Sequence, residues 1–299
     1  MTKGGKKNDH PRGGTGVSRA STAVRARLAQ WGFHPRKRYA QHFLTSRGTL
    51  ERIVGEVAPG PEDTIVEIGA GLGDLTEILA HRARLVVALE LDPALISRLT
   101  QRFGARDRVQ IVHEDALAWP LPQGLTKYPR PRVIVGNLPY NVATRILLRF
   151  SLFPQEIDRM VFMFQLEVAK RLCASPGEHA YAALSVLIQV HWDVSLAFAV
   201  QPSAFHPPPK VQSALVTFRP LPGPRVEVGE WRSFQALVKA SFGQRRKTLG
   251  NALKTLGEGD RLRIASALDR AGIDGKRRAE TLSLEDFARL SKALQETRG

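Results

Sequence analysis

The most informative stretch of this chain reads Ile65-Val66-Glu67-Ile68-Gly69-Ala70-Gly71-Leu72-Gly73-Asp74. Its apolar, β-branched start is typical of a buried strand, and the glycines that follow predict a turn into a helix. Glycine lets the backbone at such a turn pass close to a ligand, at the carboxyl end of a strand, where open α/β sheets bind their ligands. The stretch therefore predicts an α/β sheet with a ligand site at this turn.

Apolar runs and helical patterns alternate along the following 150 or so residues. We predict strands at 64–68, 85–89, 109–113, 132–135, 160–164, 184–188 and 214–218. Helices are expected near 47–57, over 74–82 and from Pro93, where a proline suits the first turn. Strands that alternate with helices indicate a mostly parallel, doubly wound sheet covered on both faces.

The two ends of the chain follow other patterns. A proline-rich linker is predicted at 219–225, and beyond it helices are expected at 231–241, 245–256, 260–271 and 284–296. Ser283 and Asp286 form a capping-box pattern before the last of these helices. Residues 1–20 lack apolar periodicity and are expected to be disordered, whereas a short amphipathic helix is predicted from Ser21.

Charge is concentrated outside the predicted sheet. Of the formal net charge of +16, residues 1–40 carry +9, residues 41–218 carry zero and residues 219–299 carry +7. Basic flanks around a neutral body are typical of a protein that grips a polyanion, with nucleic acid favoured and an anionic membrane as the alternative. A membrane span is excluded because no run of 18 or more apolar residues occurs.

Cysteine and histidine usage excludes other classes of site. The single cysteine, Cys173, excludes an internal disulfide framework and a cysteine-rich zinc site, and it fits a reducing cytoplasm. The histidines show no metal-ligand spacing, so no metal is expected.

Acidic residues at the predicted strand ends indicate which cofactor the glycine turn takes. Asp74 stands where a dinucleotide fingerprint needs glycine or alanine, and Glu67 lies where a pyrophosphate would sit. A carboxylate there suits the cationic S-adenosylmethionine better than NAD, the alternative. Glu90 can accept hydrogen bonds from ribose hydroxyls and Asp115 from an adenine amino group. Glu67 or Asp115 could instead cap backbone N–H groups at a turn.

A second motif, Gly136-Asn137-Leu138-Pro139-Tyr140, follows the strand at 132–135. The Asn137 side-chain oxygen and the Leu138 carbonyl can accept both hydrogens of an exocyclic amine, which holds its lone pair toward a methyl donor. Pro139 keeps Leu138 out of the helical conformation, and Tyr140 offers a ring for stacking a base. No general base is needed. The alternative is an ordinary Asn-x-Pro turn.

Taken together, these motifs make the chain resemble the small-subunit ribosomal RNA adenine N6,N6-dimethyltransferases, which modify two adjacent adenosines in a hairpin loop near the RNA 3′ end. The resemblance covers about residues 36–295. Besides the two motifs above, it rests on Gln41-His-Phe-Leu44, Glu90-Leu-Asp92, Glu114-Asp115-Ala116, Ala204-Phe-His-Pro-Pro-Pro-Lys-Val211 and Ser241-Phe-Gly-Gln-Arg-Arg-Lys-Thr-Leu249.

The resemblance implies a Rossmann-like, seven-stranded class I methyltransferase sheet with a smaller C-terminal all-α domain. Residues 1–34 would be a basic, largely disordered extension, 35–222 the S-adenosylmethionine-dependent methyltransferase domain, and 223–299 a basic helical RNA-binding domain. The implied cofactor contacts are His42, Leu44, Gly69, Glu90, Asp115 and Asn137, with Gln41, Gly71, Leu91 and Ala116 as neighbours.

Two further kinds of role follow from the same resemblance. Phe205 matches the aromatic residue that sandwiches the target adenine opposite Tyr140, and many family members have asparagine where this chain has His42. The residues expected to contact RNA phosphates are Lys210 and, on a helix of the C-terminal domain, Arg245, Arg246 and Lys247.

The partner implied is small-subunit rRNA or a small-subunit precursor, with no membrane. We expect a monomer, because no exposed apolar helix stripe stands out, and a cytoplasmic location. Two alternatives remain. One is the related enzymes that dimethylate a single adenine of large-subunit rRNA and confer macrolide resistance. The other is a ribosome-assembly factor that binds RNA and keeps the fold only as a scaffold.

Overall fold

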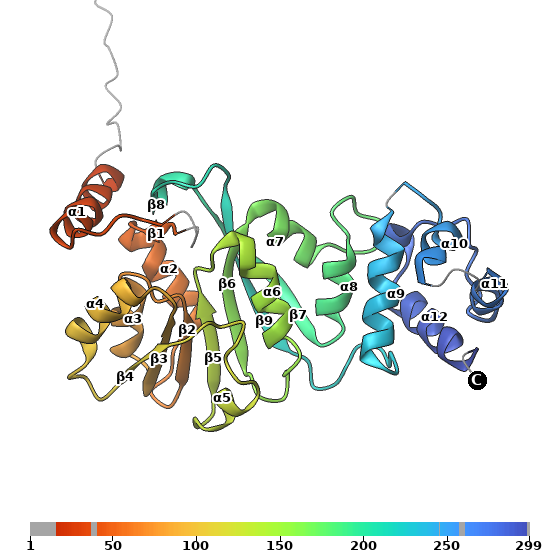
Figure 1. Cartoon of the computed structure of the whole chain (residues 1–299), viewed down its shortest axis with the longest axis horizontal. Helices are drawn as coiled ribbons and strands as arrows, with labels where there is room; N and C mark the ends of the chain where they lie inside the picture. The colour runs from red at the N-terminus through yellow and green to blue at the C-terminus, as the bar shows by residue number, and fades with distance from the viewer. Residues whose placement is uncertain (1–15, 37–40, 245, 257–260, 298–299) are drawn as a thin grey trace, which may run out of the picture.

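A seven-stranded sheet forms the centre of the protein (Figure 1). The computed structural model describes residues 16–36, 41–244, 246–256 and 261–297. In spatial order the strands are β4 (Val109–His113), β3 (Leu85–Glu90), β2 (Thr64–Ile68), β5 (Arg132–Gly136), β6 (Arg159–Gln165), β9 (Ser213–Pro220) and β7 (Trp192–Val200). The first five are parallel, whereas β9 runs antiparallel to both β6 and β7.

Helices cover both faces of this sheet, as the alternation of elements predicts. Alternate residues of β2 supply two apolar clusters: Val66 and Ile68 face one side, and Ile65 faces the other. The first side is covered by α6 (Tyr140–Phe150) and α7 (Leu166–Cys173), with the short α5 (Gln123–Thr126) beside them. The other is covered by α2 (Arg47–Val57), α3 (Asp74–Ala80) and α4 (Pro93–Phe103). Because both faces of the sheet are covered, all five residues of β2 are buried, including Thr64 and Glu67.

One strand prediction is wrong. Residues 184–188 lie in a helix, α8 (Ala183–Gln189), and the edge strand is β7 instead. A short, continuously buried apolar run fits a strand or a helix equally well, because no polar face reveals its period. The periodicity of β7 is in turn hidden by a β-bulge between Leu196 and Phe198, which breaks the alternation of inward and outward residues.

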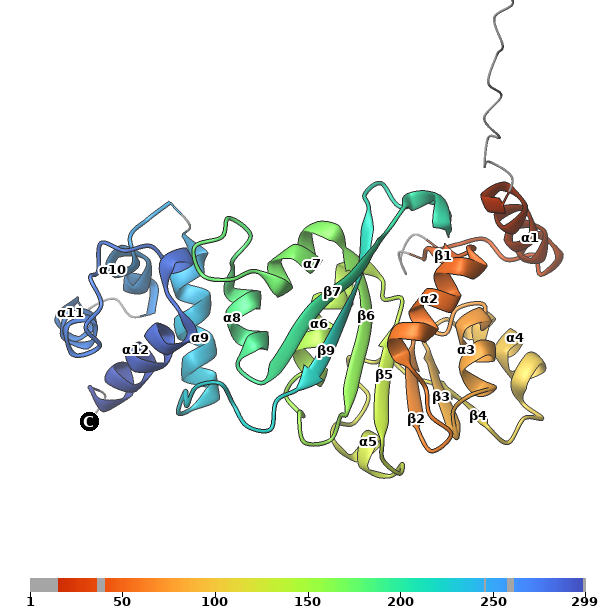
Figure 2. The same cartoon turned by 180° about the vertical axis from the view of Figure 1, so that it is seen from behind.

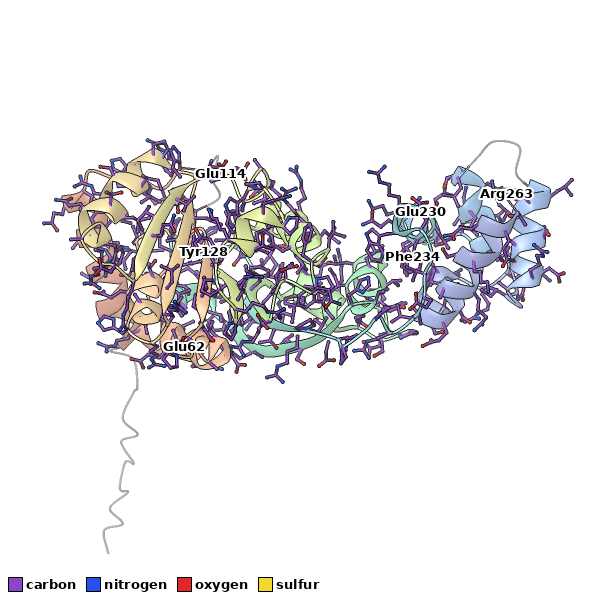
Figure 3. The ribbon with its side chains drawn as sticks, turned by 90° about the horizontal axis from the view of Figure 1, so that it is seen from below. Glu62, Glu114, Tyr128, Glu230, Phe234 and Arg263 are labelled. Atoms are coloured by element: carbon purple, nitrogen blue, oxygen red, sulfur yellow. The ribbon has the colours of Figure 1, made fainter. Side chains whose placement is uncertain are left out.

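The C-terminal helices form a second unit that packs against α8 (Figure 2). These helices are α9 (Trp231–Gly243), α10 (Leu249–Ala252), α11 (Arg261–Arg270) and α12 (Leu284–Glu296). Phe234 on α9, labelled in Figure 3, is fully buried in a cluster that also contains Tyr181 and Val186 from the preceding part of the chain. The core of the C-terminal unit therefore includes residues on both sides of the 219–225 linker.

The capping box before α12 forms as predicted. The Asp286 backbone N–H donates to the Ser283 hydroxyl at 3.2 Å, and the Ser283 N–H donates to the Asp286 carboxylate at 3.2 Å. The predicted helix at 245–256 is shorter: α10 starts at Leu249 and is followed by a 3-10 turn at Leu253–Leu256.

The N-terminal helix α1 (Gly16–Gln30) begins before the predicted Ser21, and residues 1–15 lie outside the described part of the chain. Two short strands form a pair of their own: β1 (Phe43–Leu44) pairs with β8 (Phe205–His206). The part of the molecule that contains the seven-stranded sheet and its covering helices is called the sheet lobe below. Both views show α1 and β1 together at one end of it (Figures 1 and 2). In the described ranges, no helix is both long and apolar enough to span a membrane.

Candidate active site

A cavity of about 190 Å³ lies at the carboxyl ends of β2, β3, β4 and β5. The sequence-predicted residues that line it are Gln41, His42, Gly69, Gly71, Glu90, Leu91, Asp115, Ala116, Asn137, Leu138, Pro139 and Tyr140. They come from four separate strand ends and from the segment before β1. Parallel pairing brings these ends to one edge of the sheet, as open α/β folds require.

The glycine turn forms one wall of this cavity. Gly69, Gly71 and Gly73 have φ angles of +75°, +59° and +80°, a region that residues with a Cβ rarely adopt. A Cβ on Gly69 would meet no atom within 4 Å, so this glycine leaves open space at the wall. A Cβ on Gly73 would lie 2.6 Å from the Phe103 ring, so this third glycine serves the packing of α4 instead.

Glu90 ties the glycine turn to the end of β3. Its Oε2 accepts the Gly71 N–H at 2.8 Å, and its Oε1 accepts the N–H groups of Leu91 and Asp92, both at 2.9 Å. Burial raises the pKa of Glu90, and the three N–H donors oppose that rise. At the end of β4, Asp115 accepts the Leu117 N–H at 2.8 Å. Both predicted acids thus stand in the cavity wall in fixed orientations.

The expectation that Glu67 faces a cationic ligand is wrong. Its side chain is 2% exposed and does not line the cavity. Its Oε2 accepts the Thr76 hydroxyl at 2.6 Å, which ties β2 to α3. Burial raises the pKa of Glu67 to about 8, so the carboxyl is largely protonated at neutral pH.

Glu67→Gln is expected to flatten the pH dependence of stability. The folded chain keeps a proton on Glu67 up to about pH 8, whereas the unfolded chain releases it near the ordinary value of 4.5. The contribution of Glu67 to the free energy of unfolding is therefore complete below pH 4.5 and is lost as pH rises through 8. Denaturant unfolding at about pH 5.5 and about pH 9 would measure this. Equal pH slopes for the variant and the wild type would contradict it.

The segment Asn137-Leu138-Pro139 connects β5 to α6 and belongs to neither a strand nor a helix, with Tyr140 as the first residue of α6. The Asn137 Nδ2 donates to the His42 carbonyl at 2.9 Å, which fixes the side-chain amide by its nitrogen. Among the described residues, no donor pairs with the Asn137 Oδ1, which is the acceptor that the sequence analysis requires. The Tyr140 hydroxyl bonds to the Ser213 Oγ, and burial raises the pKa of this phenol.

A second hollow, a groove of about 590 Å³, meets the cavity at its outer side. The two share Gln41, His42 and Tyr140, and the other groove residues are Pro35, Arg36, Gln165, Pro207, Pro208, Pro209, Lys210 and Val211. His42 and Tyr140 stack with ring centroids 5.9 Å apart and an interplanar angle of 25°. The His42 Nδ1 lies 2.7 Å from the Pro207 carbonyl oxygen, which connects this ring pair to the proline-rich wall.

Two predicted site residues are not brought into either hollow. Phe205 is 2% exposed and Leu44 is 8% exposed, and both pack in the apolar cluster that contains Ile65. They face each other in the β1–β8 pair, so their side chains share the inward face. In this structure the ring beside Tyr140 is therefore His42 rather than Phe205. Phe43, the neighbour of Leu44 that was not predicted, lines the cavity in place of Leu44.

The predicted RNA contacts lie in two places. Lys210 stands on the groove wall. Arg246 and Lys247 are exposed in the turn between α9 and α10, not on a helix as expected, because α9 ends at Gly243. Arg245 falls outside the described residues. Across the part of the chain that is described, no group of three or more His, Cys, Asp or Glu side chains could hold a metal ion.

The sequence pattern of the family described as ribosomal RNA adenine dimethylase matches residues 32–296. The chain belongs to this family. It is 46% identical over 265 residues to the ribosomal RNA small subunit methyltransferase A of Geobacter metallireducens. The matched region covers 88% of this chain and 96% of that relative. The protein of the same name from Latilactobacillus sakei is 40% identical over 277 residues, covering 90% and 93%.

Solved structures agree with this adenine dimethylase fold. A dimethyladenosine transferase from Plasmodium falciparum has a TM-score of 0.71 at 22% identity, covering 86% of this chain and 98% of that one. The 23S rRNA methyltransferase ErmE has a TM-score of 0.62 at 27% identity, covering 85% and 99%. The family consists of S-adenosylmethionine-dependent methyltransferases, so S-adenosylmethionine is the cofactor.

Proposed function

We propose that this adenine dimethylase transfers methyl groups to N6 of two adjacent adenosines in a 3′-terminal hairpin loop of small-subunit rRNA. The observation that carries the proposal is the position of Tyr140 and Asn137. Tyr140 lines both the strand-end cavity and the outer groove, and Asn137 lines the cavity and bonds to the carbonyl of His42, which lines both. The strand-end cavity can hold a methyl donor, and the outer groove can hold an acceptor nucleotide. The names of the relatives at 40–46% identity favour the small subunit over the large one.

The cavity fits S-adenosylmethionine on its own chemistry. When bound, this cofactor supplies a methyl group activated by a sulfonium. Gly69 leaves open space at the wall, whereas a Cβ on Gly71 would lie 3.3 Å from the Phe43 ring. No phosphate-binding cation lines the cavity among the residues described. Glu90 would accept the ribose hydroxyls, and Asp115 would accept the adenine amino group through its outer oxygen. These two acids suit a cofactor that has hydroxyl and amino donors and a positive charge.

On the acceptor side, the chain's own groups orient an amine. Asn137 Oδ1 and the Leu138 carbonyl would accept the two N6 hydrogens, which leaves the nitrogen lone pair directed toward the cavity. As the nitrogen becomes positively charged, both oxygens stabilise it. Tyr140, held by Ser213 and stacked on His42, supplies the ring that supports the base. The proton leaves to water, so no general base is required.

Basic residues around this site would hold the RNA backbone. Lys210 lies beside the acceptor groove, while Arg246 and Lys247 are exposed on the C-terminal unit. We propose residues 35–222 as the catalytic domain and 223–299 as the RNA-binding domain. A target base flips most easily from a loop, where it is already unpaired. Because contacts between these basic residues and RNA phosphates release counterions, the affinity for RNA should fall steeply as the salt concentration rises. A cytoplasmic location and a monomeric state remain predictions.

The test is methyl transfer by the purified full-length chain from S-adenosylmethionine to unmodified small-subunit particles, with large-subunit RNA as the matched control. We expect mass spectrometry of digested RNA to find N6,N6-dimethyladenosine at two adjacent positions of the small-subunit RNA alone. Modification of one adenosine of the large-subunit RNA would contradict the proposal and favour the resistance-type activity. Cofactor binding without transfer to either RNA would favour an assembly factor.

A further inference from the structure

The helix α1 lies outside the part of the chain that matches the family, which begins at residue 32. It is nevertheless docked on the sheet lobe (Figure 1). Leu28 is 3% exposed, and with Val24 it packs against Leu72 and Leu95 in a separate apolar cluster. The burial of these side chains fixes α1 against the catalytic body, although the family pattern does not include it.

On its inner side α1 contacts the glycine turn of the cofactor cavity. Leu72 is the residue between Gly71 and Gly73, so the apolar cluster includes the turn itself. Arg27 forms a two-pronged ion pair with Asp74, the residue that follows the turn: its Nη1 donates to Oδ1 at 2.7 Å and its Nη2 donates to Oδ2. A planar pairing of this kind fixes orientation as well as distance.

A second arginine holds the same turn from α4. The Arg102 Nη1 donates to the Leu72 carbonyl at 2.7 Å and to the Asp74 Oδ1 at 3.3 Å. The turn is therefore held on one side by the family's own sheet lobe and on the other by the additional helix.

On its other side α1 reaches the acceptor groove. It packs along β8, and the Arg25 Nε lies 3.4 Å from the His206 Nδ1. His206 directly precedes Pro207, which starts the proline-rich wall of the groove. One helix therefore contacts both the glycine turn and His206, the residue that directly precedes the acceptor wall.

We propose that α1 is a positioning element for methyl transfer, which holds the glycine turn and the proline-rich wall at a fixed separation, with Arg27 as its positioning residue on the cofactor side. This inference rests on the proposed assignment of the cavity to S-adenosylmethionine. The arginine touches neither cofactor nor base. It acts through Asp74 and Leu72, which are continuous with the cavity wall.

The first test is the affinity of the full-length chain for S-adenosylmethionine, measured by calorimetry without RNA. Arg27→Met is expected to raise the dissociation constant about tenfold, because a charge-assisted, two-pronged pair is lost. Arg27→Lys should recover part of the affinity, since it keeps the charge but not the fork. Arg47→Met is the matched control: its side chain is 88% exposed on α2 and, among the described residues, pairs with Glu51 alone, so affinity should stay within about twofold.

The second test uses Leu28→Asp, which should detach α1 from the cluster that contains Leu72. In steady-state kinetics we expect a higher KM for S-adenosylmethionine and also a lower kcat, because the acceptor wall loses its support. Arg27→Met should change KM far more than kcat. Thermal unfolding of each variant verifies that the sheet lobe is folded at the assay temperature.

The two proposals fail in different ways. If the wild type does not bind S-adenosylmethionine, the proposed function fails. If the wild type binds it and both Arg27→Met and Leu28→Asp match the wild type in affinity, KM and kcat, the role of α1 is overturned and the helix is only an added surface.

Discussion

Asn137→Ala is expected to lower the rate of methyl transfer by about 10²-fold or more, while RNA binding stays within about twofold of the wild type. In the proposed function, the side-chain oxygen is the acceptor that both orients the N6 amine and stabilises its developing charge. Its loss should therefore act on the transition state rather than on the RNA backbone contacts that we propose at Lys210, Arg246 and Lys247. Single-turnover transfer at saturating RNA would measure the rate, and a filter-binding assay would measure retention.

Asn251→Ala is the matched control for this variant. Asn251 is exposed on α10, and within the described ranges its side chain bonds to its near neighbours Thr248 and Lys254, so its loss should leave the saturated rate unchanged. Asn137→Ala also removes the bond to the His42 carbonyl. Near-normal turnover by the variant would mean that the amide does not hold the amine, and the acceptor mechanism would have to be abandoned.

The second large effect is expected at Glu90. Glu90→Ala should weaken S-adenosylmethionine binding by about 10²-fold, because it removes a charged acceptor and leaves three backbone N–H groups without their partner. Glu90→Gln should be nearly as harmful. Whichever way its amide turns, the NH₂ group faces a backbone donor, either at Gly71 or at Leu91 and Asp92.

Calorimetry of both Glu90 variants would test this, with Glu51→Ala as the control on an exposed ion pair of α2. Thermal unfolding separates a loss of affinity from a loss of fold. Wild-type affinity for S-adenosylmethionine in Glu90→Ala would mean that this carboxylate does not bind the cofactor. It would not affect the proposed role of Asn137 in holding the acceptor amine.

The local sequence was sufficient to predict most strands of the sheet and the glycine turn. Strands β2 and β4 have the predicted bounds, because apolar runs that end in glycine or acidic residues specify both type and limit. The local sequence could not show whether residues 184–188 form a helix or a strand, because burial on all sides removes the periodicity that distinguishes the two. The Asn137 motif and Glu90 were found from chemistry at strand ends.

Tertiary structure alone decided which side chains share a hollow. The bond between Asn137 and the His42 carbonyl joins residues 95 positions apart, and the contact of His42 with Pro207 spans 165. Neither separation leaves a local signal, because the pairing of β1 with β8 depends on the folded sheet. That pairing directs Phe205 into the core and His42 beside Tyr140. Sequence periodicity determines which segments become strands and helices, whereas the face that a two-residue strand presents depends on the packing around it.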